Sequence, residues 1–259
     1  MSSIVLYEIR SPAAVITINR PDKQNALSRA LIADLLAAFE RANNDPAARC
    51  VVLTAVGKVF CAGMDLGELA DSLKLEANEA DVIWDDVKRL CDLFERIYTL
   101  PKPTVAAVNG SAVAGGAGLV TVCDLAIAVH EAKFGYPEVH RGLVAAMVMP
   151  HLLRHVGERA ARRLLLTGEL IQADEAYRLG LINEAVSADQ LNDRVTMLCG
   201  VLAKGGPNAL AKTKELLRRF SHQAVPVEDT ARASAEPRLT KECRDGLEAF
   251  FAKKPVPWA

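Results

Sequence analysis

The chain has 259 residues, and its 31 Lys and Arg residues against 32 Asp and Glu residues give a formal net charge of −1. A content of 51% hydrophobic and 24% charged residues is typical of a folded globular protein and excludes a wholly disordered chain. The balanced charge lacks the basic excess of a nucleic-acid-binding protein, so we expect no nucleic-acid partner.

The six cysteines are scattered along the chain, with no C-x-x-C pair among them. This spacing favours free thiols in a reducing compartment over disulfides or a zinc site. The first ten residues also lack the charged and apolar segments of a signal peptide. We therefore predict a cytoplasmic protein without a bound metal ion.

The chain begins with an expected hairpin over residues 4–18, which turns at a Ser-Pro pair. Ser28 is placed to cap a helix that ends at residues 43–46. Residues 50–55 form a continuous apolar run of strand length, and residues 82–99 carry apolar side chains at helical spacing.

One uncharged stretch, residues 103–123, is long enough to cross a bilayer. It contains Pro103, Asn109 and four glycines, which favour a buried strand, a tight turn and a buried helix over a membrane span. We therefore expect no association with a membrane.

Apolar runs at 104–108 and 125–129 predict two buried strands. Strands and helices thus alternate to about residue 186, which predicts an α/β fold with a mostly parallel sheet. Helical periodicity dominates after that point. We therefore divide the chain into a core over residues 1–186 and a helical domain over residues 187–259.

Residues 110–119 are rich in Gly and Ala, follow an expected strand and open an expected helix. Small residues let a ligand approach the backbone closely, and the N–H groups that begin a helix can bind an oxyanion or a phosphate. Close packing of the helix on the strand explains the same composition, so both interpretations stay open.

Two other kinds of site are disfavoured here. Thr121 stands where a dinucleotide fingerprint needs its third small residue, and too few residues precede the next strand for a crossover helix. Ser111 lacks the flanking glycines of a hydrolase nucleophile elbow.

Four stretches together, in this order, resemble the crotonase (enoyl-CoA hydratase/isomerase) superfamily. They are Asn19-Arg20-Pro21 with Asn25-Ala26-Leu27, the run 60–66, the run 108–124 and the run 134–139. Residues 164–186 also resemble that family's passage into its helical end, so the likeness spans essentially the whole chain.

The resemblance implies a spiral of ββα units followed by a C-terminal helical domain that assembles a homotrimer or a dimer of trimers. It implies an acyl-CoA substrate, so coenzyme A would enter as part of the substrate and no separate cofactor is expected. It also implies that two backbone N–H groups hold the thioester carbonyl and stabilise an enolate. By motif position these belong to Met64 and Gly115.

Hydratases of this family commonly use two glutamates. The second matches Glu138, which we predict to be catalytic, whereas the position of the first is occupied by Gly118. Because Gly118 lies one helical turn beyond Gly115, we expect position 118 to face the same cavity. An apolar setting around Glu138 would raise its pKa toward neutrality.

The resemblance therefore implies an enoyl-CoA hydratase or isomerase. A single carboxylate, Glu138, suits the 1,3-proton shift that converts a 3-enoyl-CoA into a 2-enoyl-CoA. The likeness along the whole chain slightly favours hydration of a 2-enoyl-CoA instead. A catalytically inactive acyl-CoA-binding trimer is a third alternative, and the retained Glu138 speaks against it.

Several motif residues are expected to bind the substrate, and basic ones among them would meet the phosphates of coenzyme A. They are Arg20, Lys23, Ala62, Asp65, Leu66 and Lys253. Side chains between residues 67 and 93 are candidates for the acyl pocket, although their helical spacing fits plain core equally well. They are Leu69, Leu73, Trp84 and Val87.

Overall fold

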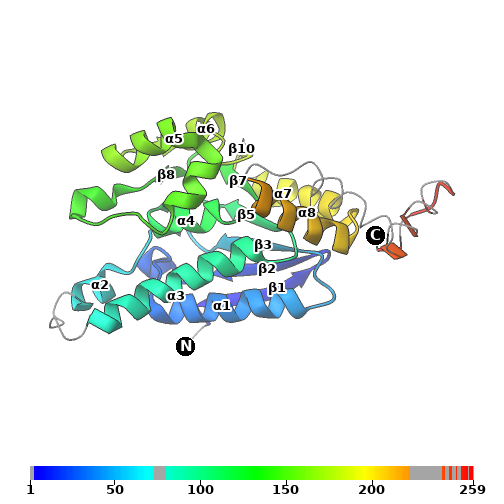
Figure 1. The fold of residues 1–259 in the computed structure, drawn as a ribbon, viewed down its shortest axis with the longest axis horizontal. Coiled ribbons are helices and arrows are strands. Elements are labelled where there is room, and N and C mark those ends of the chain that lie inside the picture. The colour runs from blue at the N-terminus through cyan, green and yellow to red at the C-terminus, as the bar shows by residue number, and fades with distance from the viewer. Residues whose placement is uncertain are drawn as a thin grey trace.

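The computed structural model describes residues 3–72, 80–221, 241–242, 245–246, 249, 252–255 and 257–258. Two β-sheets form its centre, and helices cover them (Figure 1). The larger sheet has six strands, in the spatial order β1 (Val5–Arg10), β2 (Ala13–Ile18), β3 (Cys50–Ala55), β5 (Thr104–Val108), β7 (Leu125–Val129) and β10 (Glu184–Val186). The smaller sheet has four, in the order β4 (Val59–Cys61), β6 (Ser111–Val113), β8 (Lys133–Gly135) and β9 (Leu170–Gln172).

Successive strand pairs divide between the two sheets. The first strands of three pairs, β3, β5 and β7, lie side by side in the larger sheet, and their partners β4, β6 and β8 lie in the smaller one. Neighbours within both of these groups run parallel, while β1 and β2 form an antiparallel hairpin. Each pair is followed by helix, so the expected spiral of ββα units is confirmed.

The helices follow the strand pairs in chain order. Among the described residues up to 221, the α-helices are α1 (Arg29–Asn44), α2 (Leu66–Ser72), α3 (Ala80–Thr99), α4 (Gly115–Thr121), α5 (Met149–Thr167), α6 (Ala173–Arg178), α7 (Leu191–Ala203) and α8 (Pro207–Phe220). Two short 3₁₀ helices, η1 (Pro21–Lys23) and η3 (Pro137–Arg141), precede α1 and α5.

Local signals in the sequence correspond well to these elements. The Ser28 hydroxyl accepts a hydrogen bond from the Leu31 N–H at 3.2 Å and caps α1, which ends at Asn44 as expected. The three apolar runs become β3, β5 and β7 at the expected residues, and nearly all their side chains are buried. Local pattern suffices here because strands covered on both faces must be continuously apolar.

The helical end begins after β10, and every described element beyond it is a helix. Figure 1 shows α7 and α8 beside the sheets, at the end of the molecule away from α2. The division of the chain at residue 186 remains a prediction, and part of the third helical stretch, residues 241–254, lies outside the described residues.

The described part of the chain includes five of the six cysteines and the whole uncharged stretch 103–123. These five cysteines are free thiols, while Cys243 lies outside the described residues. The uncharged stretch 103–123 forms β5, β6 and α4, and no helix among the described residues is long and apolar enough to cross a membrane.

Helix α4 lies directly against the end of β4 without intervening side chains. A Cβ atom at Gly116 would lie 2.2 Å from the carbonyl oxygen of Cys61, far inside a normal contact. A Cβ at Gly110 would similarly lie 2.1 Å from the carbonyl oxygen of Lys58. Close packing of helix on strand therefore accounts for part of the glycine-rich run.

We predict that Gly116→Ala destabilises the fold by about 1–3 kcal/mol, because the backbone must move to admit one methyl group. The matched control is Gly200→Ala in α7, where nothing lies within 4 Å of the added atom. There the better helix propensity of alanine should stabilise the protein by up to about 1 kcal/mol. Urea unfolding of both variants measures the difference, and a gain in stability for Gly116→Ala would contradict the close contact.

Candidate active site

A cavity of about 240 Å³ lies between α2, α3, the start of α4 and the segment that follows β8. Its lining is almost entirely apolar, and Glu138 and Arg141 are its two charged residues. Apolar lining with few polar groups is typical of a site that binds a small organic molecule. The remaining lining residues are Ala62, Met64, Leu66, Leu69, Val87, Leu90, Val113, Ala114, Gly115, Pro137, Leu143, Val144, Ala145, Met147 and Val148.

The Met64 N–H is left free by a β-bridge between Met64 and Leu27. Leu27 N–H donates to the Gly63 carbonyl at 2.7 Å, and Asp65 N–H donates to the Leu27 carbonyl at 3.0 Å. Because successive residues of an extended segment present their N–H groups to opposite sides, the Met64 N–H points away from Leu27. It donates no hydrogen bond to any described residue.

The Gly115 N–H donates to no described residue, because Gly115 is the first residue of α4. The preceding Ala114 has φ +53° and ψ −125°, a region that residues with a Cβ rarely adopt, and such strain is often found at functional sites. Gly63 adjoins this turn, since a Cβ on Gly63 would lie 3.4 Å from the Gly115 nitrogen. The structure thus brings Met64 and Gly115 to one cavity, as predicted.

Glu138 lies in η3 and is half-buried, with its Oε2 atom enclosed and without a hydrogen-bond partner among the described residues. Burial raises the pKa of the Glu138 carboxyl, while its own backbone N–H and the charge of Arg141 partly oppose the rise. The direction of this shift agrees with the expectation from the sequence. A carboxylate with a raised pKa is better suited to accept and return a proton.

Position 118 differs from the expectation of a side chain facing the cavity. A Cβ at Gly118 would lie 2.6 Å from both Phe94 Cζ and Val148 Cγ1, so those two side chains already fill the space. Val148 lines the cavity, whereas Gly118 does not. The helical turn from Gly115 correctly places Gly118 near the site, but residues from α3 and the segment before α5 cover it.

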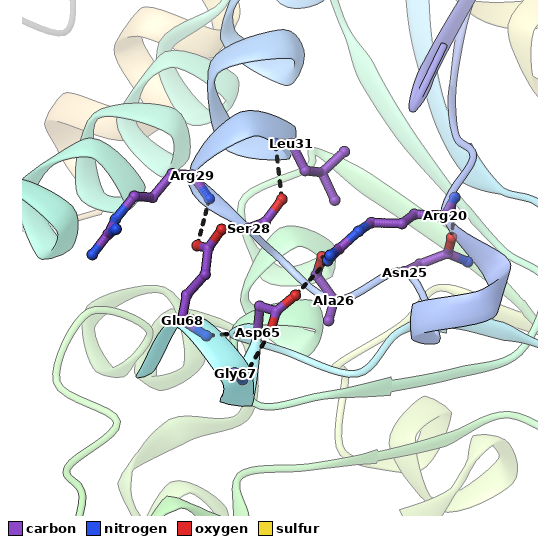
Figure 2. Close-up of polar contacts among 9 residues, drawn as sticks. All are labelled: Arg20, Asn25, Ala26, Ser28, Arg29, Leu31, Asp65, Gly67 and Glu68. Atoms are coloured by element: carbon purple, nitrogen blue, oxygen red, sulfur yellow. Dashed lines mark hydrogen bonds and ion pairs between the residues drawn. The ribbon is translucent and has the colours of Figure 1, made fainter. Parts of the chain in front are cut away.

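Two residues expected to bind substrate are instead bound to each other. Arg20 Nη1 lies 2.6 Å from Asp65 Oδ2, and both side chains are mostly buried (Figure 2). The Arg20 guanidinium also donates to the Ala26 carbonyl at 3.0 Å. Its charge is therefore neutralised within the protein instead of being presented to a nucleotide.

The other expected binding residues separate into three groups. Ala62 and Leu66 line the cavity, and Lys23 is exposed at the end of η1. Lys253 lies in the C-terminal tail. In the same tail, the Trp258 indole donates a hydrogen bond of 2.9 Å to the carbonyl of Lys204, the residue after α7. Figure 1 shows this tail, in red, beside α8 and far from α2.

The structure places the candidates for the acyl pocket differently from one another. Leu69 and Val87 line the cavity, Trp84 is 67% exposed outside its lining, and Leu73 lies outside the described residues. Sequence reasoning missed Arg141. Its signal was the three-residue spacing from Glu138, which in a 3₁₀ turn places both side chains on one face.

No group of three or more potential metal ligands exists within the described ranges. His151 and His155 are one turn apart on α5, but the His151 ring packs on Tyr98 and His155 Nε2 lies 2.9 Å from the Thr121 carbonyl.

Comparison with known proteins identifies the family. The family model described as enoyl-CoA hydratase/isomerase matches residues 8–259. A Thermus thermophilus protein, whose name assigns it provisionally to the enoyl-CoA hydratases, is 44% identical over 93% of this chain and 95% of its own length. The crotonyl-CoA hydratase of Syntrophomonas wolfei is 34% identical over 96% of this chain and 95% of its own length.

Solved structures agree with this result. The crystal structure of an enoyl-CoA hydratase/isomerase from Marinobacter aquaeolei matches with a TM-score of 0.92 and 33% identity, covering 98% of each chain. An enoyl-CoA hydratase from Shewanella pealeana matches with a TM-score of 0.93 and 29% identity, covering 99% of this chain and 96% of that one. The chain belongs to the enoyl-CoA hydratase/isomerase family and is an enzyme with the crotonase fold.

Proposed function

We propose that this enzyme hydrates a 2-enoyl-CoA thioester in the cavity that contains Glu138. One observation carries the proposal: two free backbone N–H groups, those of Met64 and Gly115, share an apolar cavity with a half-buried carboxylate. Several relatives are named as hydratases, which supports hydration as the direction of the chemistry.

The two N–H groups would hold the thioester carbonyl oxygen. When the oxygen of water adds to C3 of the enoyl group, the π electrons move onto that carbonyl oxygen and form an enolate. Backbone donors already pointing at this atom need no rearrangement as the charge develops. Each such donor typically lowers the barrier by roughly 3 kcal/mol.

Glu138 would move the proton. Its carboxylate takes a proton from the attacking water, and the same proton then passes to C2 as the enolate collapses to the 3-hydroxyacyl product. Because position 118 carries no acid, a single carboxylate performs both transfers. A pKa raised by burial makes the carboxylate a stronger base and favours the protonated form as an intermediate.

Isomerisation is the second candidate, and the single carboxylate favours it. Glu138 would remove a proton from C2 of a 3-enoyl-CoA and return it to C4, while the same N–H groups stabilise the dienolate. An inactive acyl-CoA-binding protein is less well supported, because Glu138 is present and faces the cavity.

A panel of 2-enoyl-CoA and 3-enoyl-CoA thioesters decides between these reactions. Hydration adds the mass of one water, which mass spectrometry detects. Isomerisation leaves the mass unchanged but creates the conjugated 2-enoyl thioester, which chromatography and ultraviolet absorption detect. We expect hydrated product from the 2-enoyl series. Turnover of only the 3-enoyl series would assign the isomerase reaction instead.

Contacts between lysine side chains and the phosphates of coenzyme A also remain proposals. Lys23 is exposed and can meet a phosphate near the N-terminal motif. Lys253 belongs to the C-terminal tail, which lies far from α2 within its own chain (Figure 1), so a contact with the nucleotide would come from the tail of a second copy.

We predict that Glu138→Gln lowers turnover by about 10²–10⁴-fold while an enoyl-CoA still binds, because the amide cannot accept the proton. Stability at neutral pH should not fall. The raised pKa means that the folded state binds the proton more tightly than the unfolded state, so ionised Glu138 opposes folding above that pKa. Steady-state kinetics, titration calorimetry and thermal unfolding test the three statements. Activity within tenfold of the native enzyme would exclude Glu138 from the reaction.

The pH profile should report the ionisation of Glu138. We expect kcat/KM to fall as the pH drops through a pKa above that of an ordinary glutamate, because the base must be ionised. Arg141→Leu should shift this fall in kcat/KM to higher pH, since the Arg141 charge lowers the pKa of Glu138. Arg162→Leu, on α5 outside the cavity lining, should leave it unchanged. If kcat/KM falls at the same pH in the native enzyme and in both variants, another group titrates.

We predict that Gly118→Glu does not create a second catalytic acid. The new side chain must displace Phe94 and Val148, so both stability and turnover should decrease. Gly118→Ala, which adds one carbon at the same place, should show a smaller loss of both. Thermal unfolding and initial rates measure this. A rise in hydration without loss of stability would mean that position 118 opens to the cavity.

Apolar side chains exposed on the helical end support assembly of three copies, or of six as two trimers. Met197, Val201 and Leu217 on α7 and α8 are between 61% and 65% exposed in the single chain. We expect light scattering to give three or six times 27.9 kDa, and Leu217→Lys to weaken that assembly. A monomeric native protein at micromolar concentration would overturn this prediction.

A further inference from the structure

The Met64 N–H lies between two neighbouring segments of the chain, and an ion pair between Arg20 and Asp65 connects these segments. We propose that Arg20 and Asp65 are positioning residues, which fix the Met64 N–H where the thioester oxygen needs it. The inference rests on the proposed function, because it assigns these residues a role in the same donor pair.

Asp65 directly follows Met64, and all of its polar groups are engaged: its carbonyl accepts from the Leu69 N–H at 2.9 Å, and its carboxylate contacts are drawn in Figure 2. Its N–H donates to the Leu27 carbonyl at 3.0 Å. One carboxylate oxygen lies 2.6 Å from Arg20 Nη1, and the other accepts a hydrogen bond from the Gly67 N–H at 2.9 Å. The last contact ties Asp65 to the first turn of α2, which contributes Leu66 and Leu69 to the cavity.

Arg20 is itself held on the other side of the bridge. Its Nη1 donates to the carbonyl of Ala26, the residue before Leu27, and its backbone N–H donates to Asn25 Oδ1 at 2.9 Å. The fully buried Asn25 amide in turn donates to the carbonyls of Val56 and Val59, at 2.9 and 2.7 Å. Arg20 therefore links the segment before Leu27 to the segment after Met64.

The electrostatic setting makes this link strong. Only 20% of the Arg20 side chain and 16% of the Asp65 side chain are exposed, so water screens the pair weakly. The Arg20 guanidinium also holds the pKa of the Asp65 carboxyl below its ordinary range. Removing one partner would leave the other charge poorly compensated, and its segment would move toward solvent or a new partner.

Displacement of the Met64 N–H should lower the catalytic rate more than it weakens substrate binding. Oxyanion donors act through a short distance to an atom that becomes charged during the reaction, and a misplacement of about 1 Å can reduce a rate by about 10²-fold. Coenzyme A binding depends on many other contacts and should change little.

The test compares Asp65→Asn and Arg20→Met with Asp86→Ala. The Asp86 side chain is 17% exposed, close to the value for Asp65, and it pairs with the more exposed Arg29 beside the same motif. Because Asp86 bonds neither Leu27 nor residues 63–65, it is the control for loss of a carboxylate ion pair. We expect kcat to fall about ten- to a hundredfold in the first two variants with little change in KM. The control should keep the native kcat. Arg20→Lys, which retains the charge, should recover part of the loss and serves if Arg20→Met does not fold.

A chromophoric thioester, 4-(dimethylamino)cinnamoyl-CoA, provides a readout that needs no turnover. Its absorption moves to longer wavelength when hydrogen bonds polarise the carbonyl group. We expect a red shift with the native enzyme, a smaller shift at equal occupancy with Asp65→Asn and Arg20→Met, and a native shift with Asp86→Ala.

The outcomes separate this inference from the proposed function. If the chromophoric thioester binds the native enzyme without any red shift, this result would contradict the proposed pair of N–H donors itself. Variants that keep the native shift and kcat but unfold at lower temperature would show that the ion pair only stabilises the fold. A raised KM with native kcat and a native shift would make Arg20 a substrate-binding residue, and would overturn the positioning role.

Discussion

The candidate active site depends on two turns whose backbones touch. A Cβ on Gly63 would lie 2.8 Å from the Cβ of Ala114, and α4 approaches β4 so closely that Gly116 has no room for a side chain. The two turns belong to successive ββα units and carry Met64 and Gly115. Their N–H groups share one cavity because the backbones meet there. A donor pair made from backbone is therefore a property of the packing, and side chains influence it only by moving the turns.

Charge around the cavity is divided between groups that are paired and one that is not. Arg20 and Asp65 satisfy each other, and a second ion pair joins Arg29 to Asp86 nearby. Glu138 instead keeps one oxygen enclosed without a partner among the described residues. A buried polar atom without a hydrogen bond is costly, and such costs are tolerated mainly where chemistry requires them. This contrast distinguishes the candidate acid–base residue from the carboxylates that support the structure.

Membership of the family does not by itself decide the reaction. The same fold and the same donor pair can stabilise an enolate formed by adding water or one formed by removing a proton. The number and position of the proton-carrying groups then select the outcome. In this chain Phe94 and Val148 occupy the space beside Gly118, so the cavity wall there is apolar, and Glu138 is the carboxylate that lines the cavity among the described residues. Hydration with one carboxylate needs that group both to activate water and to protonate C2.

Much of the fold could be read from local patterns, since each strand that becomes buried on both faces is a continuous apolar run. The strands β3, β5 and β7 are examples. The Ser28 cap of α1 is a second kind of local signal that the sequence shows. Ordered motifs also identified Met64, Gly115 and Glu138 as members of one site. Pattern reasoning failed where the answer depended on which distant side chain reaches a position. It did not foresee that Arg20 and Asp65 pair with each other, and it left position 118 open to the cavity.

The sequence by itself determined the α/β class, the family likeness and the residue types available for catalysis, because these follow from periodicity and from motifs along the chain. The tertiary structure alone decided that Arg20 binds Asp65, that Phe94 and Val148 cover Gly118, and that Arg141 shares the cavity with Glu138. The physical reason is that charge pairing, burial and the resulting pKa shifts depend on neighbours brought together from separate elements. Spacing along the chain does not encode those neighbours.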